Sequence, residues 1–319
     1  MREIFPVIIR GGLGKGKSDS IKSGGFILEN LYKNNPNTTD LLIDKDGWHV
    51  RGGKIDLSKL FSKNHVFINT LSERSLEDFE VRKIIEKNKG YFVGSKTMPS
   101  LVSFNKNLLK NILEKNNIRS PRHIAINVTN DIESKAFEVF KRFSLPVIIK
   151  PARSENSHGI SIARNFGEII FGLKKAFSES KTVLVEEFIK GKEVSCTILE
   201  NFRGDNLYTF PLGEIVRKGD FSDKDMKISF DYKTVFPARL SKEESALIKE
   251  MARKTHKLLG LNHYSRSDFI VSSRGIFILE INSSPLLDSG TLLHQSIAEG
   301  GLSAEQFINH LIGLAIERK

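Results

Sequence analysis

Three oxygen-bearing side chains near the C-terminal end, Asp268, Glu280 and Asn282, have the types and the spacing of a magnesium site. Carboxylate and amide oxygens suit Mg²⁺, which binds few protein ligands and completes its shell with phosphate oxygens and water. Two such ions about 3.5–4 Å apart, bridged by Glu280, would fit phosphoryl chemistry. A lone strand that ends in Glu-x-Asn is more often an ordinary solvated strand end, so the rest of the chain has to decide between the two interpretations.

A predicted β-hairpin brings the three side chains together. Residues 269–271 and 276–279 are β-rich runs, and the short segment between them has turn composition with a glycine that can take a positive φ. Side chains two apart on a strand leave the same face, which aligns the two polar groups that follow the second run. If the runs pair across the turn, antiparallel counting places Asp268 opposite residue 279 or 280.

The composition is that of a globular protein without a membrane partner. The chain has 319 residues, of which 39% are hydrophobic and 27% charged, enough for two or three small domains. The longest apolar runs have only strand length, and the first ten residues are too charged for a signal peptide. The single cysteine, Cys196, excludes an internal disulfide and is expected to be a packed thiol, which predicts a reducing cytoplasm.

The formal net charge of +11 does not by itself predict a nucleic-acid partner. The basic residues are spread along the whole chain among acidic ones, and no basic run is interleaved with aromatic residues. A small anionic substrate such as a nucleotide is a sufficient partner, so we expect no nucleic acid.

The first part of the chain predicts a small Rossmann-like α/β domain over residues 1–95, with its boundary at residues 96–99. A buried strand at 4–9 runs into a glycine-rich loop and a helix capped near Ser20. Three more strands are predicted at 40–44, 48–50 and 65–69, and an amphipathic helix at 76–88.

The glycine-rich loop defines an alternative function. Residues 11–18 match the phosphate-binding pattern G-x-x-x-x-G-K-[ST] between a strand and a helix, as a P-loop NTPase using Lys17 and Ser18 would require. The best second strand ending in an acidic residue is 41–44, which runs into a turn. The second half of the chain carries a fuller set of nucleotide and metal residues.

Two lysines in the second half occupy positions suited to phosphate. A helix capped by Ser103 places Lys106 in its first turn, where a cation is unfavourable unless an anion is near. A strand at 146–151 carries Lys150 in front of a small, polar, glycine-containing loop at 152–159. A strand lysine and the N–H groups of such a loop can hold phosphates together.

The remaining elements follow from periodicity and capping. The charged stretch at 217–237 has poor periodicity, and a loop of that length in a compact domain is usually functional or mobile. Ser241 with Glu244 and Ser303 with Gln306 form capping boxes. We expect helices at 131–143, 166–177, 241–259, 291–299 and 303–317, and strands at 160–163, 182–189, 193–199 and 212–216.

From about residue 96 onward the chain resembles the ATP-grasp superfamily, and within it the D-alanine–D-alanine ligase family. Order and spacing agree at 105–106, 147–153, 183–193, 266–268 and 280–285. The resemblance implies an α+β ATP-grasp domain over 96–319, with a central subdomain at about 103–190 and a metal and substrate subdomain at 191–319. The first domain is similar more weakly, through the pairs 11–12, 23–24 and 77–78.

The resemblance implies ATP and two Mg²⁺ or Mn²⁺ ions as cofactors, with a role for each matching residue. The ATP phosphates would lie on Lys106 and Lys150 under the loop that carries Ser154 and Ser157. The adenine and ribose would lie on Glu186, Phe188, Ile189 and Glu193, and the metals on Asp268, Glu280 and Asn282. Arg266 and the Leu286 N–H would stabilise the reacting acyl oxygen, and Lys227 and Thr291 would bind the second amino acid.

The implied function is a cytoplasmic ligase that joins amino acids, D-alanine in this family, through an acylphosphate for peptidoglycan precursors. Dimers are usual in the resembling family. The chain departs from the family pattern where the first amino acid and the lid are held: the expected glutamate, serine and tyrosine fall on Gly16, Asn156 and Ile228, and a histidine falls near Leu71. A degenerate, non-catalytic ATP-binding protein is therefore a third alternative.

Overall fold

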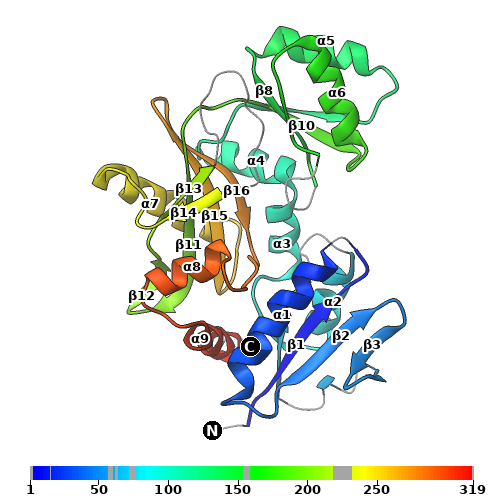
Figure 1. Cartoon of the computed structure of the whole chain (residues 1–319), viewed down its shortest axis with the longest axis vertical. Helices are drawn as coiled ribbons and strands as arrows, with labels where there is room; N and C mark the ends of the chain where they lie inside the picture. The colour runs from blue at the N-terminus through cyan, green and yellow to red at the C-terminus, as the bar shows by residue number, and fades with distance from the viewer. Residues whose placement is uncertain are drawn as a thin grey trace.

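The computed structural model describes residues 3–14, 16–56, 60–61, 64–71, 76–153, 159–217 and 232–317. Three β-sheets follow one another along the longest axis of the molecule, and Figure 1 shows the N-terminal sheet at one end and the sheet of β8 and β10 at the other. The third sheet, with β11, β15 and β16, lies between them.

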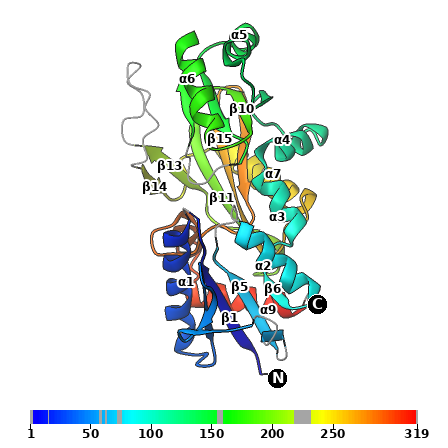
Figure 2. The same ribbon diagram turned by 90° about the vertical axis from the view of Figure 1, so that its right-hand side faces the viewer.

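The first sheet has the Rossmann-like architecture predicted from the sequence. Its six strands have the order β4-β3-β2-β1-β5-β6, and β1 pairs in parallel with both β2 and β5. Figure 2 shows α1 and α2 on opposite faces of this sheet. The strands are β1 (Phe5–Gly11), β2 (Thr39–Asp44), β3 (Gly47–Val50), β4 (Gly53–Lys54), β5 (His65–Asn69) and β6 (Tyr91–Val93), and the helices are α1 (Lys17–Tyr32) and α2 (Leu76–Lys87).

Two predicted helix starts in this half are wrong. Helix α1 begins at Lys17 rather than near Ser20, whose buried hydroxyl accepts a hydrogen bond from the Gly11 N–H at 2.9 Å. Ser103 does not cap a helix but lies at the end of α3 (Thr97–Phe104). The side chain of Asn105 caps α4 (Lys106–Lys115) instead, because its extended backbone breaks the chain into two helices.

The second sheet is antiparallel and carries two helices. Its strand order is β7-β10-β8-β9, and its core is formed by aliphatic residues from the strands and from the buried faces of the helices. The elements are β7 (His123–Asn127), α5 (Ile132–Arg142), β8 (Val147–Pro151), β9 (Ser161–Ala163), α6 (Phe166–Phe177) and β10 (Thr182–Glu187). The helices and strands that the sequence predicted here occur within two residues of their expected bounds, but β7 has no counterpart in the sequence prediction.

The third sheet has the order β14-β13-β11-β15-β16, with β12 paired to β11. Strand β12 has no counterpart in the sequence prediction, and β14 lies in the stretch expected to be irregular, so that expectation is wrong for residues 232–235. The elements are β11 (Lys192–Phe202), β12 (Asp205–Thr209), β13 (Gly213–Arg217), β14 (Tyr232–Val235), α7 (Lys242–Leu258), β15 (Tyr264–Ser272), β16 (Gly275–Asn282), α8 (Leu292–Glu299) and α9 (Ala304–Glu317).

Local signals in this half are confirmed. Both capping boxes form: the Ser241 hydroxyl accepts from the Glu244 N–H at 3.1 Å, and the Ser303 hydroxyl from the Gln306 N–H at 3.1 Å. Cys196 is fully buried in β11, and burial raises the pKa of its thiol to about 12, as expected for a packed thiol. Among the described residues, no helix is both long and apolar enough to span a membrane.

The C-terminal helix returns to the first sheet. One buried cluster contains Ile8 and Val66 from β1 and β5 together with Phe307 and Leu311 from α9. Residues far apart in the sequence therefore share one core, and the first sheet holds the end of the chain in place. The domain boundary near residue 95 remains a prediction.

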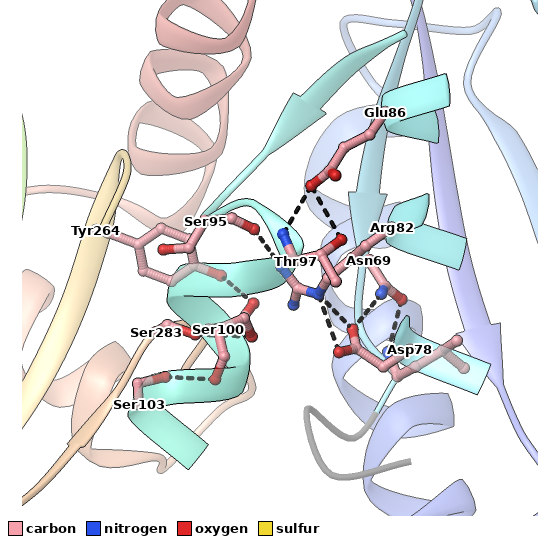
Figure 3. A network of polar contacts seen from close by, with 12 residues as sticks. Asn69, Asp78, Arg82, Glu86, Ser95, Thr97, Ser100, Ser103, Tyr264 and Ser283 are labelled. Atoms are coloured by element: carbon pink, nitrogen blue, oxygen red, sulfur yellow. Dashed lines mark hydrogen bonds and ion pairs between the residues drawn. The ribbon is translucent and has the colours of Figure 1, made fainter. Parts of the chain in front are cut away.

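A buried ion pair at the junction between the first sheet and α3 is drawn in Figure 3. Arg82 donates from Nε to both Asp78 carboxylate oxygens at 2.9 Å and from Nη1 to the Ser95 carbonyl at 2.5 Å. Asn69, at the end of β5, donates to Asp78 at 2.6 Å. Burial is the largest influence on the Asp78 carboxyl and raises its pKa despite the arginine.

The same network reaches the predicted metal hairpin. Glu86 accepts hydrogen bonds from the backbone N–H and the hydroxyl of Thr97, at the start of α3. One turn later, Ser100 accepts a hydrogen bond at 3.1 Å from the hydroxyl of Ser283, which directly follows β16 (Figure 3). Helix α3 therefore connects the first sheet to the end of the hairpin.

We expect Arg82→Met to lower the free energy of unfolding by about 3–5 kcal/mol, because it leaves the Asp78 carboxylate buried without its partner. Urea and thermal unfolding measure the change. The matched control is Lys83→Met, which removes an exposed pair with Glu80 at 3.4 Å and is expected to cost no more than about 1 kcal/mol. Equal losses in the two variants would contradict the role given to the buried pair.

Candidate active site

The β15–β16 hairpin forms in the predicted register. Asp268 lies directly opposite Glu280, and Arg266 opposite Asn282. The register shifts between Asp268 and Phe269, so residue 279 is the extra residue and Glu280 is the one that faces the aspartate. The two carboxylates and the amide are therefore neighbours on a rigid hairpin, as the sequence predicted.

The carboxylate and amide oxygens on the hairpin are ligand types that a divalent cation accepts, and both carboxylates lie beside positive side chains. Arg266 donates to both oxygens of Asp268 at 3.1 and 2.9 Å, and the Lys106 ammonium lies 3.6 Å from a Glu280 oxygen, so each carboxylate is already close to positive charge. The buried amide nitrogen of Asn282 has no hydrogen-bond partner among the described residues. No group of three or more His, Cys, Asp or Glu residues that could hold a metal occurs in the same part of the chain, so a bound ion would need further ligands such as phosphate.

The two lysines expected to hold phosphate lie on different elements. Lys106 is the first residue of α4, and its backbone N–H donates to the Ala152 carbonyl at 3.1 Å, next to the predicted phosphate loop. Lys150 lies on β8 with its ammonium 2.8 Å from a Glu186 oxygen. Ser154 and Ser157 lie outside the described residues.

The segment expected to receive adenine connects the second and third sheets. Glu186 is buried on β10, and Phe188 is half-buried in the link to β11. Ile189 packs with Ile270 and Phe277, which belong to the two strands of the hairpin. This packing places the predicted adenine segment against the same hairpin that carries the metal donors.

Two predicted ligands already have partners within the protein. Glu193, expected to bind ribose, accepts hydrogen bonds from Arg217 at 3.2 and 2.6 Å. Thr291 is the N-cap of α8: its hydroxyl accepts from the His294 N–H at 3.3 Å and donates to the Asp288 carbonyl at 2.8 Å. Their roles as ligands remain predictions, and Lys227 lies outside the described residues.

Lys110 is a charged residue of the site that the sequence prediction missed. It lies one turn after Lys106 on α4, is only 1% exposed, and its ammonium is 3.1 Å from the same Glu186 oxygen that Lys150 contacts. Burial lowers the pKa of Lys110 to about 8. Burial opposes ionisation of Glu186, but Lys110 and Lys150 outweigh it and lower the pKa of this carboxyl. The spacing of the two lysines, four residues apart on one helix, was the available signal.

Among its described residues, 11–14 and 16–18, the glycine-rich loop shows no feature specific to a nucleotide site. Lys17 and Ser18 are exposed at the start of α1. Gly11 is explained by packing, since its φ is +104° and an added Cβ would lie 2.2 Å from the Ile43 carbonyl oxygen. The structure therefore gives the P-loop alternative no support.

The positions that depart from the family pattern are apolar or lack a side chain where they are described. Gly16 is the N-cap of α1 and provides no side-chain hydrogen bond. Leu71 is 3% exposed and packs in the core with Val81 and Ile85. Glu77 is an acidic group that contacts the first loop, where it accepts a hydrogen bond from the Leu13 N–H at 3.1 Å. Asn156 and Ile228 lie outside the described residues.

Known proteins are similar to this chain in both sequence and fold. Residues 112–313 match the family model of the D-ala D-ala ligase C-terminus. The D-alanine–D-alanine ligase of Flavobacterium psychrophilum is 30% identical, with 98% of this chain and 97% of that protein covered. The D-alanine–D-alanine ligase of Halalkalibacterium halodurans is also 30% identical, over 98% of this chain and 99% of that protein.

Two solved structures share the fold along almost the whole chain. D-alanyl-alanine synthetase A from Vibrio cholerae superposes with a TM-score of 0.85 at 21% identity, over 99% of this chain and 100% of the other. The D-Ala:D-Ser ligase VanG from Enterococcus faecalis superposes with a TM-score of 0.83 at 24% identity, over 98% and 100%. The fold is that of an ATP-grasp enzyme, an ATP-dependent ligase. Within that class, the chain belongs to the D-alanine–D-alanine ligase family.

We expect Asp268→Asn to raise the Mg²⁺ concentration needed for half-maximal ATP turnover by about 10-fold or more, because one anionic ligand is lost. A magnesium titration at fixed ATP measures the shift. The control is Asp205→Asn on β12 of the same sheet, where the carboxylate pairs with Arg253 at 2.8 Å and is 43% exposed. The metal assignment fails if Asp268→Asn keeps the wild-type magnesium dependence.

Proposed function

We propose that the protein joins two D-alanine molecules with ATP and releases ADP and phosphate, as a step in making peptidoglycan precursors. The observation that supports this proposal is a set of contacts at one hairpin: Lys106 lies 3.6 Å from Glu280, which faces Asp268, and Ile189 of the segment expected to hold adenine packs against both strands. Membership of the family supports the choice of D-alanine, which the names of the relatives specify for those proteins.

Each step of the proposed reaction has residues of this chain that would bind or orient the reacting groups. Lys106 and Lys150 would bind the phosphates and orient the terminal one toward the carboxylate of the first amino acid. Mg²⁺ on the hairpin donors would supply further neutralisation of phosphate charge when bound. The carboxylate oxygen of the first amino acid attacks the terminal phosphorus and ADP leaves, which forms an acylphosphate. The amine of the second amino acid, after losing a proton, attacks the acyl carbon, and the bond from that carbon to the phosphate oxygen breaks as phosphate leaves.

Arg266 is the residue proposed to stabilise the oxyanion formed in that attack. Its guanidinium is held by both oxygens of Asp268, so its orientation is fixed before substrate binds. The Leu286 N–H and Thr291 follow in the segment after the hairpin. Leu287, which directly follows Leu286, is held against α1 because the Ser23 hydroxyl donates a hydrogen bond to its carbonyl at 2.8 Å.

The protein is further proposed to act in the cytoplasm, as a homodimer, with two magnesium ions and with the serines of the 154–158 segment over the phosphates. The absence of the family glutamate at Gly16 and of the histidine near Leu71 requires another way to hold the first amino acid. The residues expected to hold the nucleotide and the metal all match the family. The difference therefore concerns which amino acid is bound first and not the type of reaction.

Phosphate release from ATP and Mg²⁺, measured with and without D-alanine and followed by mass detection of the product, tests the activity. D-alanine is expected to stimulate release and to yield D-alanyl-D-alanine, while L-alanine is not. Stimulation only by other amino or hydroxy acids would overturn the substrate. ATP binding without stimulation by any of them would instead favour the non-catalytic alternative.

Exchanging single lysines tests where the nucleotide binds. We expect Lys150→Met to weaken ATP binding by about 10- to 150-fold, which is the loss of a hydrogen bond to a charged group. Lys17→Met, in the exposed P-loop-like segment, is expected to leave the dissociation constant unchanged. Calorimetric titration with ATP measures both, and the opposite pattern would support a P-loop site.

A further inference from the structure

One carboxylate oxygen of Glu186 is shared by two buried ammonium groups. The Lys150 ammonium lies 2.8 Å and the Lys110 ammonium 3.1 Å from this oxygen. The side chains of Lys110, Lys150 and Glu186 are 1%, 8% and 3% exposed. Two positive charges and one negative charge are therefore enclosed together, and one positive charge is left over.

The three residues come from different elements. Lys150 on β8 pairs with Leu184 on β10, and Glu186 lies two residues further along β10, so the lysine and the glutamate share one face of the second sheet. Lys110 approaches from α4, where its ammonium also donates to the Pro121 carbonyl at 3.3 Å. Because Lys110 comes from a helix outside this sheet, its charge can be removed without changing a strand.

The stability of the fold gives no reason for a second lysine at this place. Lys150 alone would neutralise Glu186, and a buried ammonium is costly to desolvate even when it is paired. The pKa of Lys110, lowered to about 8 mainly by burial, reflects that cost. An extra buried lysine that is not needed for charge balance within the protein suggests that it balances charge for a ligand.

We propose that Lys110 is a positioning residue that holds Glu186 and thereby leaves Lys150 available to the phosphates of the nucleotide. This inference rests on the proposed function, since it takes Lys150 as a phosphate ligand. Without Lys110, Lys150 and Glu186 form a neutral buried pair, and ATP has to break that pair before it can bind. With Lys110 present, the carboxylate keeps a partner when the Lys150 ammonium turns to the phosphate.

The experiment compares ATP affinity by calorimetric titration in five proteins: the wild type, Lys110→Met, Glu186→Gln, the double variant and a control. Lys110→Met is expected to weaken ATP binding by about 10- to 100-fold. Without Lys110, ATP has to separate the Lys150 ammonium from the Glu186 carboxylate, and this costs about as much binding energy as one hydrogen bond to a charged group. In the Glu186→Gln background the competing carboxylate is gone, so Lys110→Met is expected to change the ATP affinity of Glu186→Gln itself by less than about 3-fold, whatever Glu186→Gln alone does to adenine binding. The matched control, Lys115→Met, changes an exposed lysine on the same helix and is expected to have no effect.

The double variant separates positioning from a merely structural role. If Lys110 only supports the fold, Lys110→Met would weaken ATP binding by the same factor in the Glu186→Gln background as in the wild-type background. That result, or wild-type affinity in Lys110→Met, would overturn the proposal. Wild-type protein that binds ATP but does not use D-alanine would overturn the substrate alone, whereas failure to bind ATP would overturn both.

The pH dependence of the wild-type protein gives a second measurement that needs no variant to fold. The charged groups near Lys110 are Glu186 and Glu187 on β10, Lys150 on β8 and His123 on β7. Burial lowers the pKa of His123 from 6.5, so it stays neutral above pH 7. As the pH rises through about 8, Lys110 loses its proton and ATP binding is expected to weaken. Unchanged affinity between pH 7 and 9 would count against the proposal.

Discussion

The antiparallel pairing of β15 with β16 is the constraint on which the site depends. It places Asp268 opposite Glu280 and Arg266 opposite Asn282, so that two acids, an amide and a guanidinium share one end of a single hairpin. A slip of one residue would turn these side chains to the other face. Because β15 also pairs with β11 along most of its length, the register is held from both sides.

Helix α4 connects this hairpin to the second sheet through two lysines one turn apart. Lys106 lies near Glu280 on the hairpin, and Lys110 near Glu186 on β10. The proposed metal and adenine segments are thus related by one short rigid helix. On the other side, α3 and the Asp78–Arg82 pair fix the end of the hairpin to the first sheet (Figure 3).

The sequence predicted those parts of the site whose geometry is local. Asp268 and Glu280 face each other because a short turn sets a hairpin register, and both capping boxes depend on residues three apart. It failed where distant residues decide. Asn105 rather than Ser103 caps α4, and Lys110 looked like an ordinary helix lysine because its partner on β10 is far along the chain. Strands β12 and β14 were missed, since both exist mainly through pairing with β11 and β13.

The most direct test of the central claim is a crystal structure with Mg²⁺ and a non-hydrolysable ATP analogue. We expect phosphates between Lys106 and Lys150, magnesium on Asp268, Glu280 and Asn282, and adenine at the Glu186–Ile189 segment. We also expect Glu186 to keep its contact with Lys110 after Lys150 has turned to the phosphate. A nucleotide bound at the Gly11–Ser18 loop, or metal away from the hairpin, would contradict it.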